Sequence, residues 1–430
     1  MKRLFALVVV ALAMMWTALP GVVAAQSGIV VDSSDAGNDF PDGVTFDISL
    51  HSDSEITKAV FRYVIPPEGA NVYEEPECSG TRTVQCTFNL KSGPKLFLVP
   101  GANIIYRWQI EDAAGNTLET QQATFVYEDT RFDWTSMTEG NLTMWYYAGG
   151  ESDVRSLMQT GLEGLERMEQ LLDTRVGFPV KVYLYDSAED MRPAALSASE
   201  SPEEGVITLG EVFFSDTAVV AADVVSEDIL RHELAHIVIR QAVKGPFGNL
   251  PAWLSEGTAV YAQSELLSNE KRALESAIDD DDVLSLRSMS SGSLARTSVN
   301  VSLFYGQSWS LVSFLIDGYG EEKFADLFAT FKEGSTVDKA LQQVYGLNLD
   351  GLANAWRESV GLQPKQPAGQ QGRTTPLPQL TPFERNSGGS VEQEADSDGG
   401  GFPIAAVAGL AVAGILVVAA GSFVIVRRRR

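Results

Sequence analysis

Near the middle of the chain, the sequence reads Asp228-Ile229-Leu230-Arg231-His232-Glu233-Leu234-Ala235-His236-Ile237-Val238. It contains the pattern H-E-x-x-H, which takes up two of the three histidines in the chain. Residues four apart lie on one face of a helix, so His232 and His236 can direct their imidazoles at a single ion. Glu233 would lie beside them, where its carboxylate can act on metal-bound water. The stretch therefore predicts a helix that holds zinc.

The residues that flank the motif predict the limits of that helix. Ser226 suits the N-cap position, and the acidic Glu227 and Asp228 are favourable at the positive end of a helix dipole. Gly245 and Pro246 end the helical pattern.

A catalytic zinc ion needs a third protein ligand and keeps its fourth position for water. No third histidine follows the motif, so the metzincin pattern is excluded. Downstream the chain reads Leu250-Pro251-Ala252-Trp253-Leu254-Ser255-Glu256-Gly257-Thr258-Ala259-Val260-Tyr261, a second helix in which Glu256 shares a face with apolar residues. A carboxylate on such a face is costly unless it is paired or bound to metal. Glu256 is therefore the predicted third ligand, and a glutamate at the rim of the helix, in contact with solvent, is the alternative.

Taken together, the two motifs resemble those of a known family. His232-Glu233-x-x-His236 followed by Trp253-Leu254-x-Glu256-Gly257 is similar to the gluzincins. The pair most resembles the peptidase-MA-like metallohydrolases, which are related to the thermolysin-like and aminopeptidase-like zinc peptidases. The similarity covers roughly residues 140–360. It implies that His232, His236 and Glu256 bind one zinc ion per chain and that Glu233 is the catalytic base.

The resemblance also implies a hydrogen-bond donor for the oxyanion that forms during hydrolysis. Tyr305, in Leu303-Phe304-Tyr305-Gly306-Gln307-Ser308, resembles the tyrosine segment downstream of the third ligand in such enzymes. A core tyrosine with a satisfied hydroxyl is the alternative. Tyr261 is a weaker candidate, because it lies well around the helix from Glu256. The glycine-rich exopeptidase motif of the aminopeptidases, ending in Met-Glu-Asn, is absent from this sequence, which argues against aminopeptidase activity.

The region that precedes this domain has an all-β pattern. Val44, Phe46, Ile48 and Leu50 alternate with polar residues, as in a half-buried strand. Further short strands, separated by turn residues, follow up to about residue 129. Residues 26–129 are therefore predicted to form an immunoglobulin-like or fibronectin-like sandwich.

The two cysteines of the chain, Cys78 and Cys86, fall in this sandwich. Exported proteins can hold disulfides, so we expect the two residues to form a local disulfide. The alternative, a metal site, lacks further cysteines and has only His51 nearby in the sequence.

Residues 130–362 are predicted to form an α+β, zincin-type metallopeptidase domain in which strands come first and helices follow. Strands are expected at residues 142–147, 180–185 and 205–214, with a helix at 153–172. Residues 205–209 could be an edge strand that pairs with an extended peptide, or an ordinary member of the sheet. The run Asp279-Asp280-Asp281-Asp282 could bind calcium or belong to an active-site lid. A solvated loop is favoured, because no calcium-loop glycine spacing occurs there.

The two ends of the chain are predicted to lie outside the soluble fold. Residues 1–25 have the basic start, apolar run and small residues of a signal peptide, with an uncleaved signal anchor as the alternative. Residues 363–401 are rich in Gln, Pro, Gly and Ser and predict a flexible linker. Residues 402–426 are almost wholly apolar, long enough to cross a bilayer as a transmembrane helix, and precede the basic cytoplasmic tail 427–430. We therefore expect a single-pass protein of the cell membrane, bacterial by its resemblance, with its N-terminal bulk extracytoplasmic.

The overall charge of the chain excludes one class of function. The chain carries 57 acidic and 32 basic residues, a formal net charge of -25, which excludes a nucleic-acid binder. The sequence predicts a membrane-anchored extracytoplasmic zinc metallopeptidase that acts on a peptide or protein substrate. One alternative is a surface binding or adhesion protein with a catalytically inactive zincin domain, and another is a zinc hydrolase of non-peptide bonds. Glu233 favours the peptidase, because a purely structural zinc site would not need it. The sequence leaves the oligomeric state open.

Overall fold

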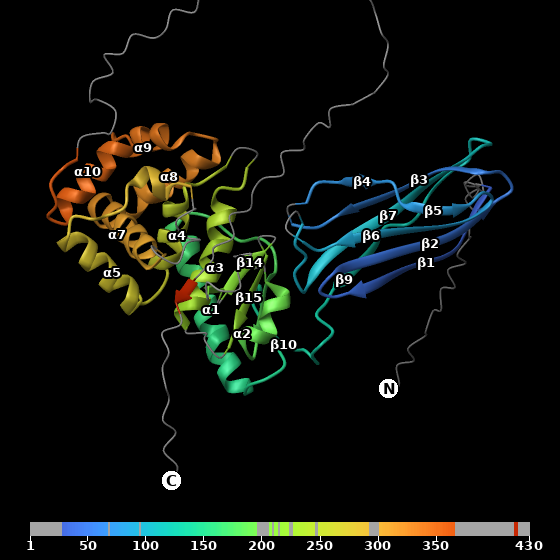
Figure 1. Ribbon diagram of the computed structural model, residues 1–430, viewed down its shortest axis with the longest axis horizontal. Coiled ribbons are helices and arrows are strands. Elements are labelled where there is room, and N and C mark those ends of the chain that lie inside the picture. The colour runs from blue at the N-terminus through green and yellow to red at the C-terminus, as the bar shows by residue number, and fades with distance from the viewer. Residues whose placement is uncertain are drawn as a thin grey trace, which may run out of the picture.

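The structure is a computed structural model, shown in Figure 1. It describes residues 28–67, 69–93, 96–195, 206–208, 210–213, 216–222, 227–245, 248–291, 301–365 and 417–419. The predicted signal peptide (1–25) and basic tail (427–430) lie outside the described residues. So do the linker from residue 366 onward and the predicted membrane span (402–426), of which only residues 417–419 are described. In the part of the chain that the structure describes, no helix combines the length and the apolar character needed to span a membrane.

The N-terminal region is a sandwich of two antiparallel sheets (Figure 1). One sheet has the order β1-β2-β6-β5, and the other has the order β4-β3-β7-β8, with β9 also pairing with β7. The strands are β1 (Ile29–Asp39), β2 (Gly43–Ser52), β3 (Ile56–Val64), β4 (Val72–Glu74), β5 (Glu77–Gly80), β6 (Thr83–Lys91), β7 (Ala102–Asp112), β8 (Thr117–Glu119) and β9 (Ala123–Tyr127).

The alternation read in the sequence is the cause of this sandwich. On β2, the side chains of Phe46, Ile48 and Leu50 are fully buried, while the residues between them face outward or are half-buried. This confirms the predicted all-β region. Cys78 on β5 and Cys86 on β6 are opposite each other in the register and form a disulfide.

A third sheet opens the second domain and has the order β10-β11-β12-β15-β14. Its three central strands are parallel, and both outer strands run antiparallel to their neighbours. The helix α1 (Glu151–Leu171) connects β11 to β12. The strands are β10 (Thr135–Glu139), β11 (Leu142–Tyr146), β12 (Val180–Tyr185), β14 (Gly210–Phe213) and β15 (Thr217–Ala221).

The single strand expected over residues 205–214 is in fact two short strands. β13 (Val206–Thr208) pairs with β16 (Val417–Ala419), whereas β14 pairs with β15 at the edge of the five-stranded sheet. The two halves of the stretch therefore belong to different sheets. The interpretation of residues 205–209 as a strand of the five-stranded sheet is wrong for the described residues 206–208, and β14 forms that edge instead.

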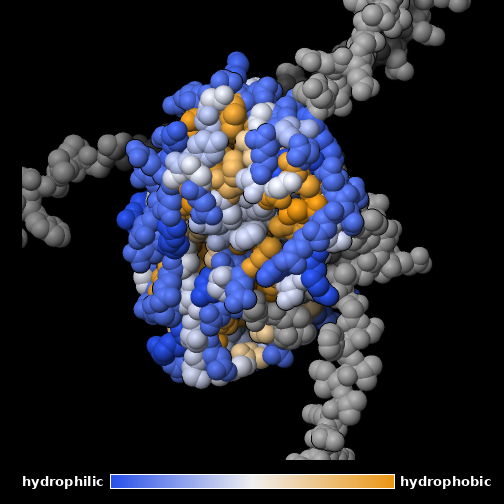
Figure 2. All heavy atoms as spheres, turned by 90° about the vertical axis from the view of Figure 1, so that its left-hand side faces the viewer, coloured by the Kyte–Doolittle hydropathy of each residue, from blue (hydrophilic) through white to orange (hydrophobic). Residues whose placement is uncertain are grey.

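The rest of the second domain is helical, as the sequence predicts. Helices α3 and α1 cover one face of the five-stranded sheet, and α4 to α10 form the end of the molecule at the left of Figure 1. Figure 2 shows that end with a largely hydrophilic surface, in which apolar residues gather between hydrophilic rims. The helices are α2 (Ala188–Met191), with a 3-10 turn at Arg192–Ala194, α3 (Glu227–Ala242), α4 (Ala252–Tyr261), α5 (Ser268–Asp279), α6 (Leu286–Met289), α7 (Val301–Tyr319), α8 (Glu321–Lys332), α9 (Val337–Tyr345) and α10 (Leu349–Ser359).

The five-stranded sheet is buried on both faces, and each face belongs to a different core. Val182 and Leu184 of β12 pack with the helices, whereas Tyr183 and Tyr185 point to the opposite side and join the core of the sandwich. Successive side chains of a strand point to opposite faces, so one strand serves both cores. The sheet thereby joins the two domains, and one of its faces supports the helix that carries the H-E-x-x-H motif.

Candidate metal centre

The motif helix α3 is buried on nearly all sides. His232 and Glu233 are fully buried, and His236 is 2% exposed. Apolar neighbours on the same helix, such as Leu234 and Ile237, are fully buried as well. The helix lies against α1 on one side and α4 on the other, which explains why it lacks a solvated face. Buried imidazoles need partners, because desolvation of an unpaired polar group is costly.

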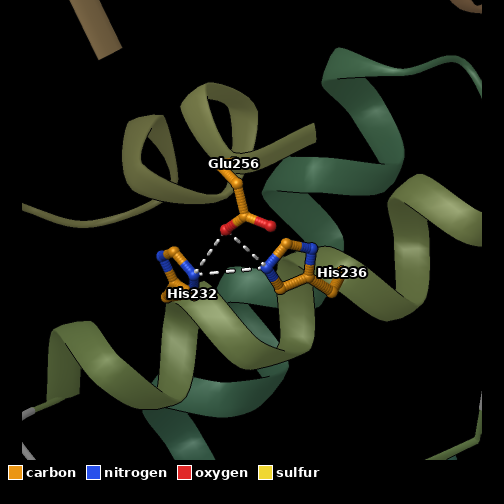
Figure 3. A group of neighbouring side chains, drawn as sticks. All are labelled: His232, His236 and Glu256. Carbon is orange, nitrogen blue, oxygen red and sulfur yellow. Dashed lines mark hydrogen bonds and ion pairs between the residues drawn. The ribbon is translucent and has the colours of Figure 1, made fainter. Parts of the chain in front are cut away.

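Those partners come from α4. Figure 3 shows the Glu256 carboxylate pointing from α4 towards both imidazoles on α3. Nε2 of His232 lies 3.2 Å from Nε2 of His236, and Oε2 of Glu256 lies 3.7 Å and 3.5 Å from these two nitrogens. Among the residues that the structure describes, these three form the group of side chains with the proximity to hold a metal ion.

These separations fit a zinc ion. Four ligands about 2.0–2.1 Å from a tetrahedral zinc ion lie about 3.3–3.4 Å from one another. The three measured separations, 3.2, 3.5 and 3.7 Å, bracket that value. Oε2 of Glu256 is buried and faces both Nε2 atoms, so it can serve as the third ligand. Two imidazole nitrogens and one carboxylate oxygen form a donor set of the kind found in catalytic zinc sites.

The electrostatics of the pocket favour the protonation states that bind metal. Burial lowers the pKa of His232, so its imidazole stays neutral at pH values at which an exposed histidine would take up a proton. For Glu256, burial acts to raise the pKa, but the neighbouring charge of His236 and hydrogen bonds from both histidines outweigh it and lower the pKa to about 2. A neutral imidazole and an ionised carboxylate are the forms that coordinate zinc.

Comparison with known proteins agrees with this geometry. Residues 160–361 match the family model of the peptidase MA superfamily. The second domain is thus similar to the peptidase MA superfamily over most of its length. At the family level, this match supports a zinc metallopeptidase-like domain.

Solved structures similar to the chain include an M1 zinc metallopeptidase from Deinococcus radiodurans. It is 14% identical, the match covers 79% of this chain and 97% of that one, and the TM-score is 0.36. An aminopeptidase N family protein from Idiomarina loihiensis is 8% identical over 75% of this chain and 74% of its own, with a TM-score of 0.39. No curated protein matches the chain.

The second domain places Tyr305 of α7 next to the candidate metal ligands. Its ring centroid lies 6.2 Å from that of His232, and its side chain is 1% exposed. Burial raises the pKa of the Tyr305 hydroxyl well above its usual value, and the charges of Glu256 and Glu233 raise it further. The hydroxyl therefore stays protonated and remains a donor. Tyr261, the weaker candidate, interacts instead with Arg167 of α1.

Two glycines bring α7 to this position. A Cβ on Gly257 would collide with the carbonyl oxygen of Ser308 on α7 and would lie 2.9 Å from Cγ2 of Val312. A Cβ on Gly306 would lie 2.7 Å from the carbonyl oxygen of Glu270 on α5. The glycine that follows the third ligand in the sequence motif is thus needed for the close contact between α4 and α7.

The structure adds a residue that the sequence did not single out. Gln263, just beyond the end of α4, is 9% exposed, and its amide nitrogen lies 3.1 Å from Nδ1 of His232. It follows Glu256 by two helical turns, a spacing that returns to the same side of a helix. That spacing is the one signal in the sequence that could have found it.

The acidic run at the end of α5 has a structural role in the described part of the chain. Asp281 forms ion pairs with Arg357 of α10, at 2.6 Å, and with Lys365, at 3.2 Å. These contacts hold the C-terminal end of the helical region against α5. They agree with the loop that the sequence favoured over a calcium site.

Proposed function

We propose that this protein is a membrane-anchored, extracytoplasmic zinc metallopeptidase that hydrolyses peptide bonds in a peptide or protein substrate, with one zinc ion per chain. The observation that carries the proposal is the triangle of His232, His236 and Glu256, with Glu233 buried beside it on the same helix. A site that served only to hold the fold together would need the three ligands but not this fourth carboxylate.

Each residue of the site has a chemical role in this proposal. When bound, zinc would lower the pKa of a water molecule and polarise the scissile carbonyl. Glu233 accepts the proton of the attacking water and returns it to the leaving amine. The hydroxyl of Tyr305 donates a hydrogen bond to the oxyanion, for which its raised pKa suits it, because it stays protonated at neutral pH.

The substrate is proposed to bind in an extended conformation. β14 is the last strand at its edge of the five-stranded sheet and contacts α3, which carries the motif. The edge of a sheet can add an extended peptide as a further strand. This geometry favours a peptide substrate over a small ester or amide.

The proposed location rests on the sequence pattern of the two ends. A signal peptide at residues 1–25 would export the two domains, and an apolar span at 402–426 followed by four arginines would anchor the chain with its C-terminus in the cytoplasm. The intervening linker would allow the peptidase domain to reach substrates above the membrane.

The test is cleavage of a mixed peptide library by residues 26–401 and by the same protein carrying Glu233→Gln, with the zinc content of both measured. Equal zinc in both proteins and cleavage by the parent alone is the expected result. Zinc in both with cleavage by neither would support the surface-binding alternative. Absence of zinc from both would overturn the metal site itself.

A further inference from the structure

A buried amide lies behind the metal site. Nε2 of Gln263 is 3.1 Å from Nδ1 of His232, the ring nitrogen that faces away from Glu256 and His236. Oε1 of the same amide is buried and has no hydrogen-bond partner. The amide nitrogen therefore has a histidine as its hydrogen-bond partner, and the amide oxygen has no partner.

This arrangement conflicts with zinc binding unless the amide is reversed. If Nε2 of His232 binds zinc, the proton of the neutral ring is on Nδ1, which then donates. An amide nitrogen facing that atom would set one donor against another. Rotation of the amide by 180° exchanges its oxygen and nitrogen, which are of nearly the same size. In that orientation, Oε1 accepts the hydrogen bond from Nδ1, and the contact between two donors is removed.

We propose that Gln263 is a positioning residue for the metal centre: its amide oxygen accepts a hydrogen bond from Nδ1 of His232 and so holds Nε2 towards zinc. This inference rests on the zinc site of the proposed function and deepens it. An acceptor behind a ligating histidine fixes the tautomer and the orientation of the ring and makes the ligand more basic.

Gln263 lies just after α4 in the chain. Its backbone N–H bonds to the carbonyl of Val260, so it continues the last turn of α4, the helix that also carries Glu256. Helix α4 and its last turn thus supply both the ligand Glu256 and the amide that contacts the ligand His232. Movement of α4 would change both at once, which keeps the two aligned.

The experiment compares the full chain with two variants at this position. Gln263→Leu keeps the size of the side chain and removes the acceptor, and Gln263→Glu keeps an acceptor and strengthens it. The dissociation constant for zinc is measured by competition with a chromophoric chelator, and the unfolding midpoint of each zinc-free protein is measured alongside. We expect zinc to bind the leucine variant about 10–100-fold more weakly, and the glutamate variant at least as tightly as the parent.

A matched control separates positioning from packing. Gln307 on α7 is fully buried and bonds the backbone of Leu284 through both amide atoms, away from the metal ligands. Gln307→Leu is expected to lower the unfolding midpoint without changing zinc affinity.

Three results bear on the inference. A leucine variant that binds zinc like the parent would overturn the role of Gln263 and leave the proposed peptidase standing. Equal losses in the leucine and glutamate variants would show that the volume, not the acceptor, matters, and would overturn it as well. A parent chain that binds no zinc would overturn the inference together with the proposed function.

Discussion

The hydroxyl of Tyr305 lies beside carboxylates on α3 and α4 and keeps its proton because burial and those charges raise its pKa. We expect Tyr305→Phe to lower kcat by about 10²–10³ with little change in KM or zinc content, since it removes a donor that acts in the transition state. Peptide-cleavage kinetics and zinc analysis check this. A kcat within twofold of the parent would favour the core-tyrosine interpretation instead.

A second residue, Glu270 in the first turn of α5, makes the stability of the domain depend on pH. It is 3% exposed, and burial raises the pKa of its carboxyl to about 8 from the ordinary 4.5. Because the folded protein binds this proton more tightly than the unfolded chain does, the stabilisation is complete below about pH 4.5. Between about pH 4.5 and pH 8, the free energy of unfolding falls by about 1.4 kcal/mol per pH unit, and above pH 8 this stabilisation is lost.

Glu270→Gln resembles the protonated carboxyl and is expected to remove that part of the pH dependence. Urea unfolding at pH 5, 6.5 and 8 measures the free energy of unfolding of both proteins. The variant should gain stability relative to the parent as the pH rises. A difference that does not change with pH would contradict the assignment.

At the scale of elements, the close packing of α4 and α7 links the third ligand to Tyr305. Gly257→Ala adds a Cβ that collides with Ser308, so α7 must shift. We expect a loss of about 1–3 kcal/mol in unfolding free energy. Activity should fall as in Tyr305→Phe, with zinc retained, because the ligands lie on α3 and α4.

Gly318→Ala on the same helix is the control, because no atom beyond its own stretch of helix lies within 4 Å of the added Cβ. It should leave activity unchanged and stabilise α7 by up to about 1 kcal/mol. If both alanine variants behave alike, the collision is not the cause of the effect.

Elements that depend on contacts between residues close in the sequence can be predicted from it, whereas contacts between distant residues cannot. The helix around His232 and the strand at β2 were predictable, because caps, i,i+4 spacing and alternation are local signals. The division of residues 205–214 between two sheets was not, since β13 pairs with a strand some two hundred residues away in the sequence. The spacing from Glu256 places Gln263 on the ligand side of α4, but its contact with His232 depends on how α3 and α4 pack, which no local signal predicts.

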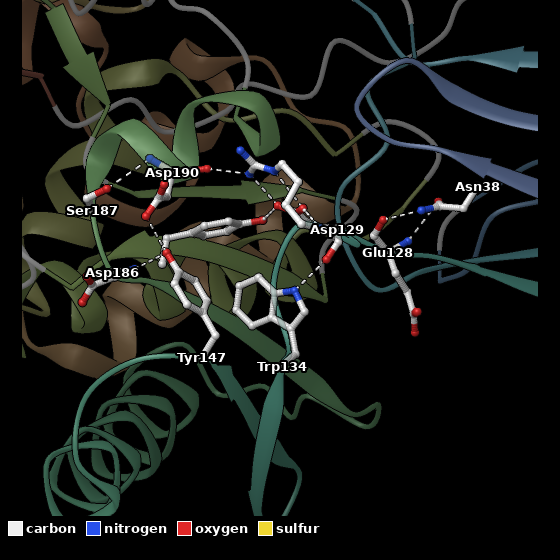
Figure 4. A network of polar contacts seen from close by, with 10 residues as sticks. Asn38, Glu128, Asp129, Trp134, Tyr147, Asp186, Ser187 and Asp190 are labelled. Carbon is white, nitrogen blue, oxygen red and sulfur yellow. Dashed lines mark hydrogen bonds and ion pairs between the residues drawn. The ribbon is translucent and has the colours of Figure 1, made fainter.

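At the scale of the whole molecule, the sandwich is connected to the five-stranded sheet by residues 128–134, the segment between β9 and β10. Figure 4 shows the network there, centred on Asp129. Its buried carboxylate accepts hydrogen bonds from Arg131, at 2.9 and 2.6 Å, and from the hydroxyl of Tyr185, at 2.9 Å. Its backbone carbonyl accepts from the indole of Trp134. Arg131 also donates a hydrogen bond to the backbone carbonyl of Asp190 on α2. Residues 128–134 are therefore bonded both to the five-stranded sheet, through Tyr185, and to α2.

Loss of this carboxylate should therefore loosen the joint between the domains. Asp129→Ala leaves the guanidinium of Arg131 and the buried hydroxyl of Tyr185 without their acceptor, at a cost of roughly 2–3 kcal/mol. We expect the thermal unfolding of the two domains to separate into two calorimetric transitions, and proteolysis near residues 128–135 to become faster. Asp133→Ala, an exposed carboxylate in the same segment, is the matched control and should behave like the parent. A single, unshifted transition in the Asp129 variant would mean that the shared core around Tyr183 and Tyr185 holds the domains together without the network.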